Sequence, residues 1–330
     1  GSLALWLNNG AGAFVDESEA RLPQVDALCS AIETGDVNGD RRPDAIVATR
    51  DAVNRVLMYH DGVFVDETDT RLPETATQTY DAVLADVDGD GDDDLVHLND
   101  RRQDELLAND GVGVFADMPG ALPAADNESV TGESADVDGD GDPDLLVAAG
   151  SQGLRILVND GTGVFADETA GRVPDVDAFV IGVLPADIDV DGDLDLFLAC
   201  MGQDRMLVND GDGVFADSTA ELLPGSGDAR TFGAAFADVD DDWDPDLYLA
   251  RPDGQNELWM NAMEKPRVRI TYTPAVVETG TPVQITVEAR DEDGIAGLTA
   301  TVDGMALPLT AGTAVYTPLA AGEYTIEAAA

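Results

Sequence analysis

The residues best suited to chemistry are aspartates at alternate positions of the stretch DVDGDGDPDL, which starts at Asp136. Two carboxylates held about 4 Å apart near a protein surface repel each other by roughly 4 kcal/mol, so the cluster needs a compensating positive charge. A bound cation is the simplest candidate. Hard oxygen ligands in this number suit calcium, whereas magnesium prefers a tighter octahedron that keeps more water.

The stretch belongs to a loop of the form D-x-D-x-D-G-x-x-D, in which several oxygens can converge on one ion. The predicted ligands are the side chains at positions 1, 3, 5 and 9 and the backbone carbonyl at position 7. Five copies of the loop start at residues 36, 86, 136, 187 and 238. A solvated acidic turn could account for one copy but not for five in register. The sequence therefore predicts up to five Ca²⁺ ions, held by Asp36, Asn38, Asp40, Arg42 and Asp44; by Asp86, Asp88, Asp90, Asp92 and Asp94; by Asp136, Asp138, Asp140, Asp142 and Asp144; by Asp187, Asp189, Asp191, Asp193 and Asp195; and by Asp238, Asp240, Asp242, Asp244 and Asp246.

The five loops are unequal at the bend, position 6. Three copies have glycine there, whereas Arg41 and Trp243 occupy it in the first and fifth loops. If the bend has a positive φ, a residue with a Cβ is strained there by roughly 1 kcal/mol or more. The first loop also has Asn38 in place of an aspartate and places Arg41 and Arg42 beside the ion. We expect it to be the weakest site.

An EF-hand is the main alternative that the same loop chemistry allows. It needs a glutamate at position 12 and flanking helices. Position 12 is instead occupied by residues inside strand patterns, namely Val47, His97, Val147, Leu198 and Leu249. The loops therefore belong to strands.

The elements that position the loops repeat with the same period of 50 or 51 residues. Each period contains a second signature, such as ILVNDGTGVFADET from Ile156, in which Asn-Asp-Gly between apolar runs indicates a hairpin. One period is interpreted as four short strands, and no segment shows a sustained helical periodicity. Four-stranded units too small to bury their own faces pack around an axis. The predicted fold is all-β, with a β-propeller of four-stranded blades.

These motifs carry a resemblance to a known family. The pattern D-x-D-x-D-G-x-x-D-L, the pattern N-x-G-x-G-x-F-x-D-x-T and the segment FGAAFADVD from Phe232 resemble FG-GAP and VCBS repeats, which are related to the propeller of integrin α subunits. The resemblance covers residues 3 to about 262. It implies a propeller, commonly seven-bladed, on secreted or surface proteins, with calcium in the loop between the first two strands of a blade. With five loops visible, we expect residues 1–264 to be a propeller truncated at its N-terminus.

The composition changes from Arg267 onward. Segments such as RVRITYTP and PVQITVEARD alternate apolar and polar residues over short runs separated by Gly and Pro, as in a β-sandwich. This part resembles a bacterial immunoglobulin-like domain. The predicted second domain is therefore an immunoglobulin-like sandwich over residues 265–330, truncated before its last strand.

The charge limits the partners. The chain has 67 acidic and 17 basic residues, for a net charge of −50. Such a chain repels phosphate and anionic lipid, so nucleic acid is disfavoured as a partner. No apolar run approaches 18 residues, which argues against direct membrane insertion. Cys29 and Cys200 are interpreted as buried small residues, with a disulfide as the alternative.

The sequence predicts no enzyme. It shows no nucleophile elbow, phosphate-binding loop or zinc spacing, and His60 and His97 are interpreted as a turn residue and a strand residue. The predicted function is an extracellular, calcium-stabilised binding or adhesion module that presents blade loops to a protein or glycan ligand. Two alternatives remain. One is a structural spacer in a large surface protein. The other is the propeller of a calcium-dependent polysaccharide lyase, because some calcium-bearing polysaccharide lyases resemble this propeller.

Overall fold

The structure is a computed structural model, and it describes residues 3–73, 78–125, 127–225, 227, 230–252, 254–261, 267–273, 283–290, 299–302, 305–307, 309, 313–316 and 326–329. The chain divides into two compact units, the first formed by residues 1–235 and 249–257 and the second by residues 236–248 and 258–330. The predicted domain boundary at residues 264 and 265 lies outside the described residues and stays a prediction.

Four antiparallel, four-stranded sheets make up most of the first unit, and each uses its strands in sequence order. We call them blades 1 to 4. Blade 1 comprises β3 (Cys29–Gly35), β4 (Asp44–Thr49), β5 (Arg55–His60) and β6 (Val63–Asp66); blade 2, β7 (Thr79–Ala85), β8 (Asp94–Arg102), β9 (Glu105–Asn109) and β10 (Phe115–Asp117); blade 3, β12 (Thr131–Ala135), β13 (Asp144–Ala148), β14 (Leu154–Asn159) and β15 (Phe165–Asp167); and blade 4, β16 (Val180–Ala186), β17 (Asp195–Cys200), β18 (Arg205–Asn209) and β19 (Phe215–Asp217).

Shorter strands flank these blades. The hairpin of β1 (Trp6–Asn8) and β2 (Phe14–Asp16) precedes blade 1, and β11 (Asn127–Glu128) extends blade 2 by pairing with the end of β8. A three-stranded sheet follows blade 4 in the sequence, with β20 (Gly233–Ala237), β21 (Asp246–Ala250) and β22 (Glu257–Trp259).

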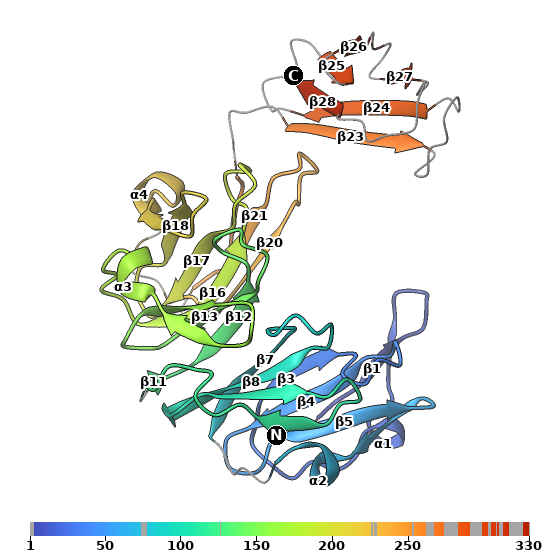
Figure 1. Cartoon of the computed structure of the whole chain (residues 1–330), viewed down its shortest axis with the longest axis vertical. Coiled ribbons are helices and arrows are strands. Elements are labelled where there is room, and N and C mark those ends of the chain that lie inside the picture. Colours follow the sequence, from blue (N-terminus) through green and yellow to red (C-terminus); the bar gives the residue numbers. More distant parts are fainter. Residues whose placement is uncertain are drawn as a thin grey trace. The chain divides into compact units, whose positions relative to one another are not determined.

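The core lies between consecutive blades, as a propeller requires. The second strands of blades 1, 3 and 4 are buried at every position. Three apolar clusters each join two successive blades, and the one between blades 1 and 2 contains Ile46, Met58 and Leu95. The first strands also lie side by side, β7 against both β3 and β12 (Figure 1). The prediction of an all-β fold with four-stranded propeller blades is confirmed; the number of blades in the whole ring stays a prediction.

The helices of the described residues are single turns that follow the outermost strands. They are α1 (Ser18–Arg21), α2 (Thr68–Arg71), α3 (Thr169–Arg172) and α4 (Thr219–Leu222). The first residue of α2, α3 and α4 uses its hydroxyl to accept a hydrogen bond from a backbone N–H of the blade's third strand, as Thr169 does from Ile156 at 2.9 Å, and Ser18 of α1 accepts from the N–H of Leu5 just before β1. No helix in the described part of the chain has the length and apolar character needed to cross a membrane.

The C-terminal part of the second unit forms two three-stranded antiparallel sheets. One contains β23 (Arg267–Thr273), β24 (Val283–Arg290) and β27 (Thr313–Tyr316), and the other β26 (Met305–Leu307), β25 (Thr299–Val302) and β28 (Ile326–Ala329). Ile285 of β24 is buried. These strands fit the alternating pattern of the sequence, while the immunoglobulin-like assignment stays a prediction.

Candidate metal-binding loops

The Asp-rich loops join the first and second strands of their sheets, which is where the sequence predicts them. Their bend at position 6 has a positive φ in all five copies: 67° at Arg41, 96° at Gly91 and Gly141, 104° at Gly192 and 75° at Trp243. The condition set for the bend is therefore met, and Arg41 and Trp243 place a residue with a Cβ in a left-handed conformation.

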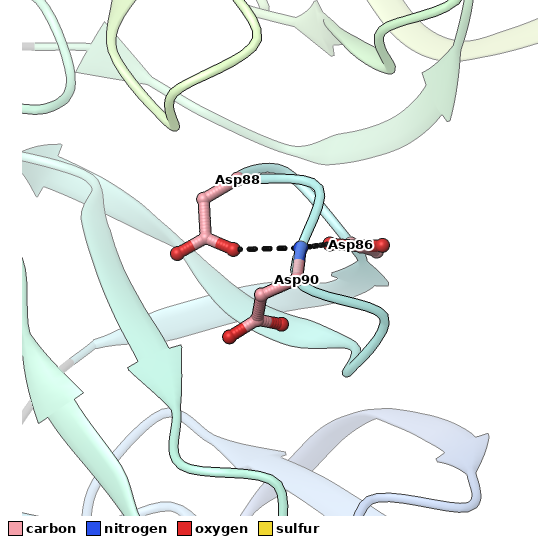
Figure 2. A group of neighbouring side chains, drawn as sticks. All are labelled: Asp86, Asp88 and Asp90. Atoms are coloured by element: carbon pink, nitrogen blue, oxygen red, sulfur yellow. Dashed lines mark hydrogen bonds between the residues drawn. The ribbon is translucent and has the colours of Figure 1, made fainter.

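Four of the five loops bring three carboxylates together. In each, one oxygen from every member lies within 4.8 Å of the others. Figure 2 shows this for the second loop, where the N–H of Asp90 donates to Asp86 Oδ1 at 3.1 Å and to Asp88 Oδ1 at 3.2 Å. The trios are Asp86, Asp88 and Asp90; Asp136, Asp138 and Asp144; Asp187, Asp189 and Asp195; and Asp238, Asp240 and Asp246.

Two of these loops contain a carboxylate oxygen that the protein leaves unsatisfied. Asp138 Oδ1 and Asp187 Oδ1 are buried, and neither has a hydrogen-bond partner among the described residues. A buried anionic oxygen without a partner carries a large desolvation cost. A divalent cation would remove that cost, so the donor set of the third and fourth loops fits calcium. Such an ion would neutralise the converging carboxylates and thereby fix the loop.

The aspartate at position 9 also accepts hydrogen bonds from backbone N–H groups, a structural role that the sequence did not reveal. In every loop its Oδ1 accepts a hydrogen bond from the backbone N–H at the end of the third strand, as Asp144 does from Asn159 at 2.9 Å. In the second to fifth loops its Oδ2 accepts from the N–H at position 2 as well, for example Asp144 from Val137 at 3.2 Å. The same hydrogen bonds are made by Asp44, Asp94, Asp195 and Asp246, except that Asp44 makes only the first.

Burial dominates the electrostatics of this position. It raises the pKa of Asp94 and of Asp144 to about 6, although the hydrogen bonds that their carboxylates accept from backbone N–H groups act in the opposite direction. The pKa values of Asp44 and Asp195 are raised for the same reason. Without an ion, the charged carboxylates at these positions are therefore destabilising, and a cation would favour their ionised form.

Position 5 belongs to the trio in the second loop but not in the third to fifth loops, and position 7 belongs to none of the trios. The position-5 carboxylates of the third to fifth loops accept hydrogen bonds from the N–H at position 7, as Asp140 does from Asp142 at 2.9 Å. The side chain of Asp142 lies against Gly161 in the hairpin turn, where any Cβ would collide with it. This close approach explains the glycine in the turn of the repeat. The structure thus places Asp140 and Asp142 beside their trio but not within it.

The first loop forms no such trio among its described residues. Both oxygens of Asp36 accept hydrogen bonds from backbone N–H groups, those of Asp40 at 2.9 Å and of Arg41 at 2.6 Å. Arg42 occupies position 7, with Nη1 3.8 Å from Asp61 Oδ1. The Asp36 hydrogen bonds also occur at Asp86 of the second loop, whereas the arginine at position 7 does not. This cation fits the expectation that the first site is the weakest, which stays a prediction because it concerns affinity.

The comparisons with known proteins address this repeat directly. A family model described as FG-GAP-like repeat matches residues 36–97, 86–147, 136–198 and 187–249. The chain belongs to the FG-GAP-like repeat family. The four overlapping matches each run from one Asp-rich loop to just past the next, so they cover most of the region with the 50-residue period.

The solved structures to which this chain is similar include three proteins of low sequence identity. One is a lectin of Agrocybe aegerita that recognises non-reducing terminal N-acetylglucosamine, with 16% identity, a TM-score of 0.45 and 81% coverage of both chains. Another is the Photorhabdus luminescens Tc holotoxin pore, with 20% identity, a TM-score of 0.43 and coverage of 91% of this chain and 16% of that one. The third is the V. cholerae biofilm matrix protein Bap1, with 14% identity, a TM-score of 0.42 and coverage of 92% and 61%. Comparison with curated protein sequences gave no match.

In blades 2, 3 and 4 the asparagine of the hairpin signature joins its repeat to the preceding one by hydrogen bonds. Its Nδ2 donates to the carbonyl at position 2 of the preceding repeat's Asp-rich loop and also to a carbonyl in its own loop. The sequence indicated only a turn residue here, because the bonded carbonyl lies 72 residues away. The donors and acceptors between blades are Asn109 to Val37 at 2.9 Å, Asn159 to Val87 at 2.8 Å, and Asn209 to Val137 at 2.8 Å.

An arginine at the end of α3 adds a protein cation to the third repeat's loop. Arg172 Nη2 donates to Asp138 Oδ2 at 2.9 Å, Nε donates to Glu168 at 2.8 Å, and Nη1 donates to the carbonyl of Asp212 in the next repeat at 2.9 Å. The sequence did not predict this contact, because 34 residues separate Arg172 from Asp138. Arg172 partly neutralises the third loop and holds Asp138 in place.

Proposed function

We propose that this FG-GAP-like propeller is a calcium-stabilised, non-catalytic binding or adhesion module that presents its blade loops to a protein or glycan ligand. The observation that supports calcium most strongly is the pair of buried, unpartnered oxygens on Asp138 and Asp187, each within a group of three converging carboxylates. Backbone N–H groups already donate to other carboxylate oxygens of the third loop, such as those of Asp136 and Asp144, but none reaches Asp138 Oδ1. A cation of the kind that oxygen ligands prefer would be the missing partner.

Export of the protein to a calcium-rich medium forms part of the proposal. The loop tips are exposed: Gly89 and Asp90 in the second loop, and Gly139 and Asp140 in the third. Open loops made of carboxylates suit the millimolar calcium found outside cells, where extracellular modules bind calcium with dissociation constants of about 10⁻⁴–10⁻³ M. We therefore propose a secreted or cell-surface location.

Calcium titration of the chelator-treated protein by isothermal calorimetry tests the metal part of the proposal. We expect binding at several sites, with magnesium giving much weaker heats. Asp187→Asn should weaken one site, because it keeps the side-chain shape but removes the charge of the unpartnered carboxylate. Asp69→Asn, at an exposed position of α2 outside the Asp-rich loops, is the control and should leave the titration unchanged. A flat calcium titration of the wild type would contradict the proposal.

The binding part is tested by presenting the calcium-loaded protein to immobilised glycans and extracellular-matrix proteins. We expect at least one of them to retain the protein and the chelator to release it. Each polysaccharide should also be incubated with the protein in solution, and the unsaturated products of lyase cleavage followed by ultraviolet absorbance. Sustained product formation would contradict the non-catalytic assignment.

A further inference from the structure

A pocket of about 770 Å³ lies where the first Asp-rich loop meets the turn of blade 1 and the hairpin β1–β2. Three of its lining residues are arginines, Arg21, Arg41 and Arg42. The chain has only 17 basic residues against 67 acidic ones, so three arginines around one pocket run against the general character of the protein. The pocket is therefore a site at which this acidic protein can attract an anion.

Comparison between the repeats shows how the charge of this loop differs. Arg41 stands at the bend, where the second, third and fourth loops have glycine, and Arg42 stands at position 7, where the other four loops have aspartate. Asn38 replaces a further aspartate. Residues 36–44 carry a net charge of −1, whereas the corresponding residues 86–94 carry −6. The first loop therefore carries much less negative charge than the second and places two arginine side chains where the second loop has glycine and aspartate.

The guanidinium groups of the loop remain available to a ligand. Arg41 is exposed, and its guanidinium has no hydrogen bond or ion pair among the described residues. Its backbone is held at a φ of 67°, a conformation in which a residue with a Cβ is strained and which often marks a functional position. Arg42 Nη1 is 3.8 Å from Asp61 Oδ1, too far for a hydrogen bond, and the Asp61 side chain is fully exposed to solvent.

The remaining walls suit the face of a sugar ring. Tyr59 and Phe64 meet edge to face with ring centroids 5.2 Å apart, and Leu5 and Leu7 add apolar surface. The Arg42 guanidinium lies 6.0 Å from the centroid of Tyr59. Planar guanidinium groups bind carboxylate or sulfate through paired hydrogen bonds, and aromatic side chains pack against the apolar C–H face of a sugar.

We propose that this arginine pocket binds an acidic sugar unit, a carboxylate- or sulfate-bearing residue of a polysaccharide. The guanidinium groups of Arg41 and Arg42 bind the anionic group, while Tyr59 and Phe64 support the ring. A volume of about 770 Å³ lies within the range of small-ligand pockets and leaves room for one or two sugar units. The inference rests on the proposed binding function and adds a ligand class and a place to it.

The test is calorimetric titration of the full, calcium-loaded chain with oligogalacturonate, a neutral galactose oligomer of equal length, and a sulfated galactose oligomer. The variant Arg41→Gly with Arg42→Asp gives the first loop the residues of the second. The control is Arg101→Gly with Arg102→Asp, which changes the net charge by the same amount and also replaces an arginine of positive φ, since Arg101 has a φ of 53°. Melting temperatures establish that both variants fold.

We expect the wild type to bind at least one acidic oligomer, the loop variant to lose at least tenfold in affinity, and the control to stay within twofold. The two acidic oligomers show whether carboxylate or sulfate is preferred. Equal binding by the loop variant, equal binding of the neutral oligomer, or no binding of either acidic oligomer would overturn the arginine pocket. The proposed function and the pocket can fail separately. If the loop variant binds the acidic oligomers as tightly as the wild type does, and the protein still binds a glycan or a protein in the presence of calcium, the proposed function stands and only the pocket fails.

Discussion

The hydrogen bonds between blades predict a large loss of stability for Asn159→Ala. Asn159 is buried; its Nδ2 donates to the carbonyls of Val87 at 2.8 Å and Pro143 at 3.2 Å, and its Oδ1 accepts from the N–H of Gly161 at 3.2 Å. Alanine would leave these three backbone groups without their partner. At about 1 kcal/mol for each hydrogen bond, the free energy of unfolding should fall by roughly 3 kcal/mol.

The chain supplies its own control at the same position of the repeat. Asn8 is exposed, and its Oδ1 accepts a hydrogen bond from the N–H of Gly10 at 2.9 Å. Urea unfolding followed by circular dichroism should therefore show less than about 1 kcal/mol of loss for Asn8→Ala. Asn159→Asp should be at least as destabilising as Asn159→Ala, because it turns the donor into an acceptor that faces two carbonyls. Equal losses for Asn8→Ala and Asn159→Ala, or a mild effect of Asn159→Asp, would refute this reasoning.

Three further predictions concern the loops and the core. Asp140→Ala should remove more of the calcium-dependent rise in melting temperature than Asp40→Ala does, because the third loop bends at a glycine and the first at an arginine. Calorimetry with and without chelator measures this rise for each variant, and a larger loss from Asp40→Ala would contradict the prediction. The pKa values of Asp94 and Asp144 lie near 6 in the folded state, above the value in the unfolded chain. The calcium-free protein should therefore gain stability as the pH falls from 7 through 6 to about 4, whereas the calcium-loaded protein should lose stability as protons displace the ion. Parallel pH profiles of the melting temperature for the two forms would contradict this. Burial raises the pKa of the Cys200 thiol to about 12, so iodoacetamide should label Cys200 at pH 8 only after unfolding, and labelling of the native protein detected by mass spectrometry would contradict its burial.

The fold was predictable because its signals are periodic. The recurrence of the Asp-rich loop every 50 or 51 residues gave the repeat, and Asn-Asp-Gly gave the hairpin between the third and fourth strands. The positive φ at Arg41 and Trp243 followed from the glycines at the same position of other loops. These features follow from local sequence patterns and from their repetition, so they can be predicted without knowing which blades are in contact.

Contacts between distant residues were not predictable in the same way. The side chain of Asn159 suits a turn on its own, and its bonds to Val87 depend on how two blades pack. The contact of Arg172 with Asp138 likewise crosses from the end of one blade back to its first loop. Position 9 looked like a simple metal ligand, but Asp144 also joins two backbone segments through hydrogen bonds. Such dual roles arise from burial, which a motif does not encode.

The most direct test of a calcium-stabilised propeller is scanning calorimetry of the full chain in millimolar calcium and in excess chelator. An ion that binds only the folded loops raises the free energy of unfolding by about 2.7 kcal/mol per site when its concentration is a hundred times the dissociation constant. With several loops occupied, the melting temperature should fall markedly when calcium is removed and recover when calcium, but not magnesium, is restored. Identical melting temperatures in calcium and in chelator would contradict the account.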